Sequence, residues 1–265
     1  MDLGLKDAVV VVTGGASNIG RAIALGFAAE GANLLIADID GPQSSRVADE
    51  ARNAGAQDVA THIGDLVADS QAEEVVGAAI DRWGRVDVLV NNVGWAQPTK
   101  FLNDTDRGVW QRTVDLNLFT TIAMTQAVLP RMKDAGEGSI VFIASDAADG
   151  QARHGIYGAA KAGVVALART VAREHGRHGI RSNVVCPGFV IPQSEVEIGE
   201  GSLWRAGVQE VFGGADESDL LRTIPLGRLT SGQDIADAVL WFSSARAARQ
   251  VTGQLVSVSG GFWMP

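Results

Sequence analysis

The chain of 265 residues carries a net charge of −9 and no cluster of lysines or arginines, a composition that argues against nucleic-acid binding. Hydrophobic residues make up 46% of it, but no apolar run is long enough to cross a membrane. The single cysteine, Cys186, cannot form an internal disulfide, and residues 1–6 contain no apolar region typical of a signal peptide. We therefore expect one cytoplasmic domain over residues 1–265.

Short β-rich runs alternate with longer helical patterns along the chain. The runs expected to form strands are 8–12, 33–37, 59–62, 86–90, 139–144, 181–186 and 254–258. Helical periodicity is present over 21–29, 70–83, 105–133, 155–177 and 232–243. This alternation predicts an α/β fold with a doubly wound parallel sheet of about seven strands and helices on both faces. Such sheets bind ligands at the carboxyl ends of their strands.

The first predicted strand ends in a glycine-rich turn over residues 13–20, which runs directly into a helix. Glycines such as Gly14 and Gly20 permit positive φ angles and a close backbone approach. The N-terminus of the helix offers unpaired N–H groups to a pyrophosphate. A tight connection between strand and helix, without a ligand, is the alternative interpretation.

The second predicted strand ends at Asp38. A carboxylate in this place accepts hydrogen bonds from the ribose hydroxyls of a dinucleotide and repels a 2′-phosphate. No arginine or lysine lies between residues 14 and 20 to bind that phosphate. The pattern favours NAD over NADP, and a plain strand-end cap is the alternative.

Tyr157 and Lys161 lie four residues apart in the helical pattern over 155–177, so their side chains share one face of the helix. A phenol is a poor base at neutral pH, because its pKa is near 10. A cation ~4 Å away lowers such a pKa by ~3 units at an effective dielectric constant of ~20. The pair is therefore a candidate for acid–base chemistry, although a surface pair on an amphipathic helix has the same spacing.

Together these features resemble the short-chain dehydrogenase/reductase family, in its single-domain branch of about 250 residues. The resemblance covers nearly the whole chain, from the glycine turn to Val251-Thr252-Gly253-Gln254 and Gly260-Gly261. It also includes the Asn91-Asn92-Val93-Gly94 turn, Ser145, and the Tyr157 and Lys161 pair. It implies a Rossmann-type sheet and no metal.

The resemblance assigns roles to individual residues. Tyr157 would be the base and Lys161 would lower its pKa, while Ser145 would hydrogen-bond the developing carbonyl oxygen and Asn117 would anchor a proton-relay water. The residues implied for cofactor binding are Gly14, Ser17, Asn18, Ile19, Gly20, Asp38, Asp65, Leu66, Asn92, Gly94, Tyr157, Lys161, Pro187, Gly188 and Val190.

Three residues depart from the family pattern. Asn18 replaces the middle glycine of the turn, and asparagine tolerates a left-handed φ better than other non-glycine residues. Val93 replaces an alanine close to the cofactor. Pro192 stands where many relatives carry a threonine that bonds the nicotinamide carboxamide, so the resemblance does not carry that contact over to this chain, and the loop start is stiffer.

The segment from about 189 to 228 occupies the position of the family's substrate loop, or lid. Its apolar residues, together with Trp95, predict a hydrophobic or cyclic secondary alcohol or ketone as substrate, unless they only pack the lid onto the domain. Arg153 and His154 could recognise a polar or carboxylate group, or lie in a solvated loop. The candidate substrate residues are Trp95, Arg153, His154, Phe189 and Trp204.

The expected activity is that of an NAD-dependent alcohol dehydrogenase or ketoreductase. The alternative is a catalytically silent NAD-binding protein with a regulatory or binding role, which would be free to lose the four catalytic residues. Enoyl reduction is a third option, although that branch usually spaces its tyrosine and lysine more widely than Tyr157 and Lys161.

The C-terminal residues Phe262, Trp263 and Met264 are large and apolar, so something should cover them. A neighbouring subunit is the expected cover, and the resemblance implies a homotetramer with 222 symmetry. The alternative is that the tail folds back over its own substrate cleft.

Overall fold

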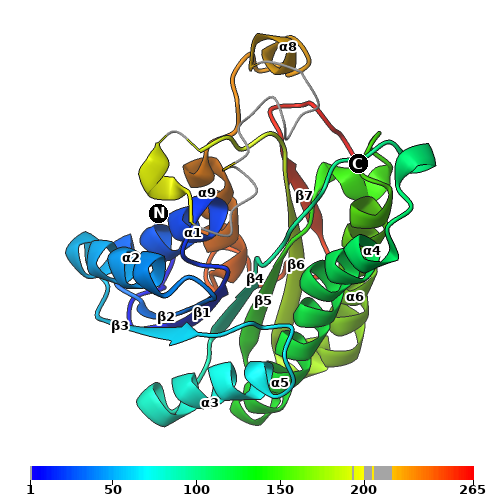
Figure 1. The fold of residues 1–265 in the computed structure, drawn as a ribbon. Coiled ribbons are helices and arrows are strands. Elements are labelled where there is room, and N and C mark those ends of the chain that lie inside the picture. The colour runs from blue at the N-terminus through cyan, green and yellow to red at the C-terminus, as the bar shows by residue number, and fades with distance from the viewer. Residues whose placement is uncertain (1, 193, 200–204, 206–216) are drawn as a thin grey trace.

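The computed structural model describes residues 2–192, 194–199, 205 and 217–265. Within these residues, seven parallel strands form one sheet in the order β3-β2-β1-β4-β5-β6-β7, as Figure 1 shows. The strands are β1 Val9–Thr13, β2 Asn33–Asp38, β3 Asp58–Ile63, β4 Val88–Asn91, β5 Gly138–Ile143, β6 Ile180–Pro187 and β7 Leu255–Val258. The predicted doubly wound sheet is confirmed, and each predicted strand lies within two residues of an observed one.

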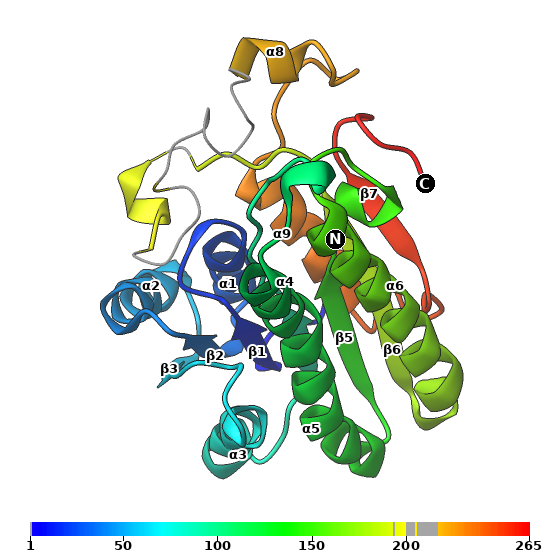
Figure 2. The ribbon, with the colours of Figure 1, turned by 45° about the vertical axis from the view of Figure 1, so that its right-hand side comes forward.

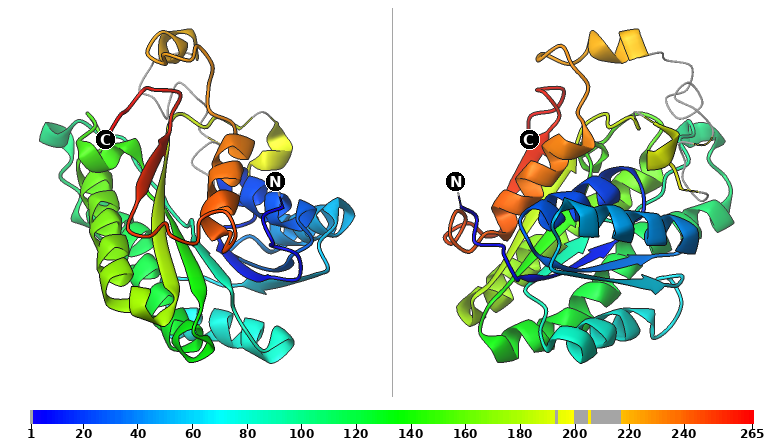
Figure 3. Two further views of the ribbon diagram at one scale, coloured as in Figure 1. Left: turned by 180° about the vertical axis from the view of Figure 1, so that it is seen from behind. Right: turned by 90° about the vertical axis from the view of Figure 1, so that its left-hand side faces the viewer.

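Helices cover both faces of the sheet (Figures 2 and 3). One layer contains α1 Asn18–Ala29, α2 Gly41–Ala54 and α9 Gly232–Ser243, and the other contains α3 Gln71–Trp83, α4 Arg107–Val114, α5 Thr120–Ala135 and α6 Gly155–His175. The short helix α8, Glu217–Leu221, lies beyond the strand ends (Figure 1).

The sequence of β1 explains why both faces are covered. All five of its residues are buried. Val10 and Val12 pack with the α1, α2 and α9 layer, whereas Val9 and Val11 pack with the opposite layer. Side chains alternate between the two faces of a strand, so a central strand buried on both sides reads as a continuous apolar run.

The single helix predicted over 105–133 is divided in the structure. It begins at Arg107 because the Asp106 carboxylate accepts hydrogen bonds from the N–H groups of Gly108 and Val109, which caps the helix. Between α4 and α5 the backbone forms a π-helical turn over Asp115–Phe119. Such turns often accompany functional sites, and this one contains Asn117.

The strand order reverses between β1 and β4, so the chain leaves these neighbouring strands toward opposite layers. The carboxyl ends of the central strands therefore border a crevice. The glycine turn follows β1, Asp38 ends β2, Asn92 follows β4 and Ser145 follows β5. The fold thus gathers the predicted site residues at one edge of the sheet.

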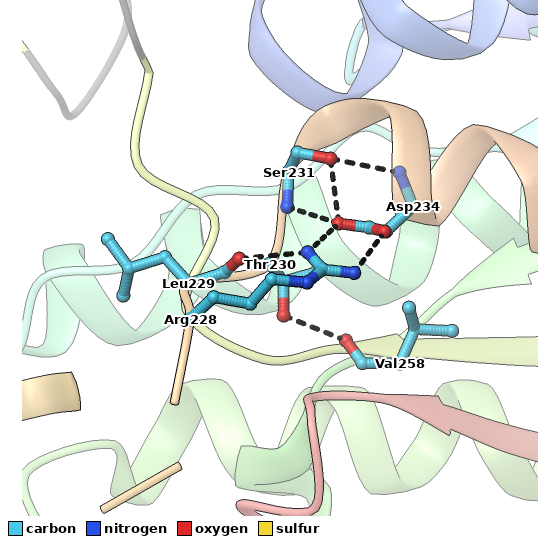
Figure 4. Close-up of polar contacts among 6 residues, drawn as sticks. All are labelled: Arg228, Leu229, Thr230, Ser231, Asp234 and Val258. Carbon is cyan, nitrogen blue, oxygen red and sulfur yellow. Dashed lines mark hydrogen bonds and ion pairs between the residues drawn. The ribbon is translucent and has the colours of Figure 1, made fainter. Parts of the chain in front are cut away.

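Polar contacts at the start of α9 fasten the segment that precedes it (Figure 4). Ser231 and Asp234 form a reciprocal capping box, and both oxygens of Asp234 pair with the Arg228 guanidinium at 2.8 Å. Thr230 donates a hydrogen bond to the carbonyl of Val258 at 3.3 Å. These contacts join α9 to the end of β7.

We expect Asp234→Asn to lower the free energy of unfolding by about 1 kcal/mol at neutral pH, measured by urea denaturation. The Arg228 guanidinium holds the pKa of Asp234 below its usual range. The stabilisation is therefore complete above about pH 4, the ordinary value, and is lost as the pH falls through the folded value. Asp237→Asn, on the next turn, removes the same charge from a carboxylate whose exposed bond from Gln233 an amide oxygen can also accept, and serves as the control. Equal losses in the two variants would contradict the assignment.

Candidate active site

A cleft of about 920 Å³ opens at the carboxyl ends of the strands. Every residue predicted to bind the cofactor lines it, as do Ser145, Trp95, His154 and Phe189. Asn117 and Arg153 are not among the residues lining this cleft, and Trp204 lies outside the described residues. The strand ends thus bring together most of the predicted site.

The glycine turn has the backbone geometry of a phosphate cradle. Gly14 and Asn18 adopt positive φ angles of 61° and 41°, which confirms the prediction that Asn18 tolerates this conformation. A Cβ on Gly20 would collide with the carbonyl oxygen of Gly14, so only glycine lets the helix approach the turn. Ser17, the N-cap of α1, makes no side-chain capping bond. The first N–H groups of α1 therefore have no acceptor in the Ser17 side chain, and residues 17–20 line the cleft, which fits a pyrophosphate.

Asp38 lies beside this turn at the end of β2. Its carboxylate accepts hydrogen bonds from the N–H groups of Ala16 at 3.0 Å and Asp40 at 3.1 Å. Burial raises the pKa of Asp38, and these N–H bonds oppose the rise. Asp38 thus also holds the glycine turn in place, a structural role that the sequence did not indicate.

Asn92 joins the ends of β4 and β1. Its side-chain Nδ2 donates to the carbonyls of Thr13 at 3.0 Å and Gly14 at 2.9 Å, while its backbone N–H donates to Thr13 Oγ1. Asn92 thus holds the ends of the two central strands together. The Thr13 hydroxyl therefore also helps to join the two strand ends, a role that its position at the end of a valine run did not indicate.

Ser145, Tyr157 and Lys161 form a cluster at the inner end of the cleft. Ser145 follows β5, and its hydroxyl is hydrogen-bonded to the phenol of Tyr157. Lys161 Nζ lies 5.8 Å from the centre of the Tyr157 ring, which confirms that the two share one face of α6. The ammonium donates to the carbonyl of Ile143 at 2.8 Å. The site therefore holds a hydroxyl, a phenol and an amine in one small region.

The pKa of Tyr157 is raised in the protein chain alone, whereas we expected Lys161 to lower it, so that prediction is wrong. Burial raises the pKa of Tyr157 to about 12, although the hydrogen bond from Ser145 opposes this rise. Burial also lowers the pKa of Lys161 to about 8. A cation ~6 Å away provides only ~2 to 3 kcal/mol at an effective dielectric constant of ~20. Desolvation of the phenol therefore outweighs the attraction of the ammonium.

Asn117 is fully buried behind the cleft wall. Its Nδ2 donates to the carbonyls of Trp95 at 2.7 Å and Thr113 at 2.8 Å, and its Oδ1 accepts from the N–H of Trp95 at 3.3 Å. A Cβ on Gly94 would lie 2.9 Å from Asn117 Oδ1 and 3.2 Å from Lys161 Nζ. Gly94 thus lets this loop approach the lysine, and the Asn117 side chain holds Trp95 against the cleft.

The candidate substrate end of the cleft is aromatic. Phe189 lies against Phe262, with ring centres 4.5 Å apart. The guanidinium of Arg112, which the sequence analysis missed, lies 5.2 Å from the centre of the Trp95 ring and lines the cleft. The ring of His154 packs edge-on against Tyr157 at 5.8 Å. These contacts provide an apolar wall with a few polar groups.

The guanidinium of Arg153 is only partly engaged within the protein, because its buried Nε has no hydrogen-bond partner. Its φ is 69°, its Nη2 donates to the carbonyl of Pro98 at 3.2 Å, and its own carbonyl accepts from Thr99 N–H. It therefore ties the loop after Trp95 to the start of α6.

The C-terminal tail folds back over its own chain, which was the alternative to cover by a neighbour. Phe262 lines the cleft, and Trp263 packs against the core and donates to Asp149 at 3.3 Å. Met264 is exposed. Phe262 and Trp263 are therefore partly covered by their own chain.

No helix among the described residues has both the length and the apolar composition that a membrane span requires. In the same part of the chain, no three His, Cys, Asp or Glu side chains gather into a group that could hold a metal ion.

The comparisons with known proteins agree on one family. A family model described as enoyl-(acyl carrier protein) reductase, which belongs to the short-chain dehydrogenase/reductase group, matches residues 14–263. The chain is 32% identical to 7alpha-hydroxysteroid dehydrogenase of Escherichia coli, over 98% of this chain and 96% of that protein. It is 35% identical to (2S)-((R)-hydroxy(phenyl)methyl)succinyl-CoA dehydrogenase subunit BbsD of Thauera aromatica, over 98% of each.

A solved structure, 7 alpha-hydroxysteroid dehydrogenase complexed with NADH and 7-oxo glycochenodeoxycholic acid, superimposes with a TM-score of 0.87. It is 31% identical, and the match covers 98% of this chain and 96% of that one. Fold, motifs and sequence similarity extend over nearly the whole chain. The chain therefore belongs to the short-chain dehydrogenase/reductase family of oxidoreductases.

Proposed function

We propose that this protein is an NAD-dependent dehydrogenase that interconverts a secondary alcohol and a ketone, with Tyr157 as its proton-transfer group. The observation that carries the proposal is the cluster of Ser145, Tyr157 and Lys161 at the inner end of the cleft. A silent dinucleotide-binding protein has no need to place a buried ammonium beside a partly buried phenol, because burial opposes the charged form of each.

The dinucleotide would lie along the cleft, with its pyrophosphate on the N–H groups of α1 and its adenosine ribose at Asp38. When bound, it supplies the hydride acceptor or donor and, in its oxidised form, a positive charge close to the reacting carbon. The carboxylate of Asp38 favours NAD, because a 2′-phosphate there would meet a negative charge. Ile39, the next residue, is exposed and lines the cleft without offering a compensating cation.

The side chains of this chain perform the acid–base part of the reaction. Ser145 would hydrogen-bond the substrate oxygen, and Tyr157 would take the hydroxyl proton during oxidation or return it during reduction. The ammonium of Lys161 stabilises the phenolate and is held by the carbonyl of Ile143. Asn117 would keep the loop of Trp95 in position beside the reacting groups.

The substrate is proposed to be a hydrophobic cyclic or aryl secondary alcohol, or the matching ketone. Trp95, Phe189 and Phe262 provide the apolar surface for such a molecule. The two named relatives fit this class, since one is named for a steroid alcohol and the other for a hydroxy(phenyl)methyl group. A panel of such alcohols with NAD, and of ketones and enoyl thioesters with NADH, tests the proposal. Reduction of enoyl thioesters alone would favour the reaction in the family model's description.

Tyr157→Phe is expected to lower kcat at least a thousandfold while leaving the Kd for NAD nearly unchanged, because only the proton-transfer hydroxyl is removed. Lys161→Ala should weaken both turnover and cofactor binding. Steady-state rates and fluorescence titration with NAD measure the two effects. A Tyr157→Phe enzyme that kept more than about a tenth of the wild-type rate would exclude Tyr157 as the base.

Asp38→Asn is expected to reduce the preference for NAD over NADP, expressed as a ratio of kcat/KM values, by about tenfold or more. Asparagine retains an oxygen that can accept from Ala16, so the glycine turn should persist. Adding Ile39→Arg should reduce the ratio further, because the guanidinium can pair with the 2′-phosphate. Equal use of NAD and NADP by the unmodified protein would refute the role of Asp38.

A homotetramer remains our proposal for the assembly. Phe119, in the π-helical turn, is 53% exposed, and Trp241 of α9 is 38% exposed, which leaves apolar side chains on helices of both layers. Light scattering coupled to size exclusion should give a mass near four copies of the 27.7 kDa chain. Phe119→Asp should reduce that mass if the turn lies in an interface. A mass of one or two copies in the unmodified protein at micromolar concentration would overturn the tetramer.

A further inference from the structure

Asp146, the residue after Ser145, is an unexpected feature of the site. Asp146 and Lys161 are the two charged side chains that are buried among the described residues, with exposed fractions of 7% and 2%. Lys161 has a hydrogen-bond partner in Ile143, whereas neither carboxyl oxygen of Asp146 has one. A buried carboxyl group without a partner is costly when it is ionised. Its place beside the catalytic cluster therefore needs an explanation.

The surrounding elements hold Asp146 close to Tyr157. Asp146 begins the short 3-10 turn Asp146–Asp149, and the Ser145 hydroxyl caps this turn by accepting from Ala147 N–H at 3.2 Å. The turn packs tightly on α6, because a Cβ on Gly158, next to Tyr157, would collide with the carbonyl oxygen of Ala147. The turn that carries Asp146 is thus packed directly on the helix that carries Tyr157.

The ionisable groups that face Asp146 are few. Tyr157 faces it from α6 and Cys186 from β6, and the Asp146 carboxylate raises the pKa of both. Lys161 acts on Cys186 in the opposite direction. His154, beside Tyr157, has a pKa lowered by burial, and Asp149 lies on the outer side of the turn, where it accepts from Trp263. Cys186 also raises the pKa of Tyr157, but burial raises the pKa of the Cys186 thiol itself to about 12. Of these two groups, the carboxyl of Asp146 is therefore the one that can carry a negative charge near neutral pH.

We propose that Asp146 is a positioning residue for the acid–base step, which acts through Tyr157: its buried carboxyl sets the pH at which the phenol changes its protonation state. This inference rests on the proposed function, because it gives the phenol a catalytic role. The phenolate forms most easily when Asp146 is neutral, since two unpaired negative charges in one buried site repel each other. Burial raises the pKa of Asp146 to about 7, so its charge changes near neutral pH.

Tyr157 is the only tyrosine in the chain, so tyrosinate absorbance reports this one group and needs no substrate. We expect Asp146→Asn to raise the ionised fraction of Tyr157 about tenfold at the highest pH at which circular dichroism shows both proteins folded. The matched control is Asp149→Asn, which removes the same charge three residues further along the turn and should leave the fraction unchanged. If Asp146→Asn does not fold, Asp146→Ser takes its place. Equal ionised fractions in the Asp146 variant and the wild type would overturn the inference.

Two further measurements separate this role from a merely structural one. The pH midpoint of kcat/KM should move to lower pH by about one pH unit in Asp146→Asn, and not in Asp149→Asn. A carboxyl whose folded pKa is raised destabilises the protein above its unfolded value, near 4, so wild-type stability should fall between about pH 4 and 7 and that slope should disappear in Asp146→Asn. An unmoved midpoint and an unchanged slope would also count against the proposal. Failure of Tyr157 as the base is detected separately, by Tyr157→Phe.

Discussion

The structure of this site depends on burying the ammonium of Lys161 and partly burying the phenol of Tyr157. Burial raises the pKa of Tyr157 to about 12 and lowers that of Lys161 to about 8, so each is driven toward its neutral form. The groups that resist this change are few: the Ser145 hydroxyl at the phenol and the Ile143 carbonyl at the amine. Both follow from the position of β5, whose end lies beneath α6. The chemistry of the pair is therefore inseparable from the packing of that helix on the sheet.

Three glycines allow neighbouring segments to pack closely on α6 and on Lys161, because a side chain at any of these positions would crowd its neighbour. A Cβ on Gly94 would lie 3.2 Å from the lysine nitrogen, one on Gly158 would collide with Ala147, and one on Gly163 would lie 3.2 Å from Leu118. Glycine inside a helix costs about 1 kcal/mol relative to alanine. Two such positions in α6 indicate that the approach of neighbouring segments matters more here than helix propensity.

Much of the fold could be predicted because its physical signals are local. The parallel strands are buried on both faces, so their apolar runs mark them, and Asn18 has the positive φ that its place in the glycine turn implied. The direction of the Tyr157 pKa could not be predicted, because spacing places Lys161 nearby but says nothing about desolvation. The sequence likewise gave no sign that the Arg153 guanidinium donates a hydrogen bond to the carbonyl of Pro98, because that contact forms only in the folded loop.

The π-helical turn is a feature that the apolar pattern of the sequence does not reveal, although it positions a residue of the site. A single helix over 105–133 was expected, because one extra residue in a turn hardly disturbs an apolar pattern of that length. That turn places Asn117 where its side chain bonds both the N–H and the carbonyl of Trp95, while Gly94 brings the same loop to within reach of Lys161. The wall of the substrate end and the catalytic lysine are thus held by one loop. A change in Asn117 would disturb both, although its side chain does not line the cleft.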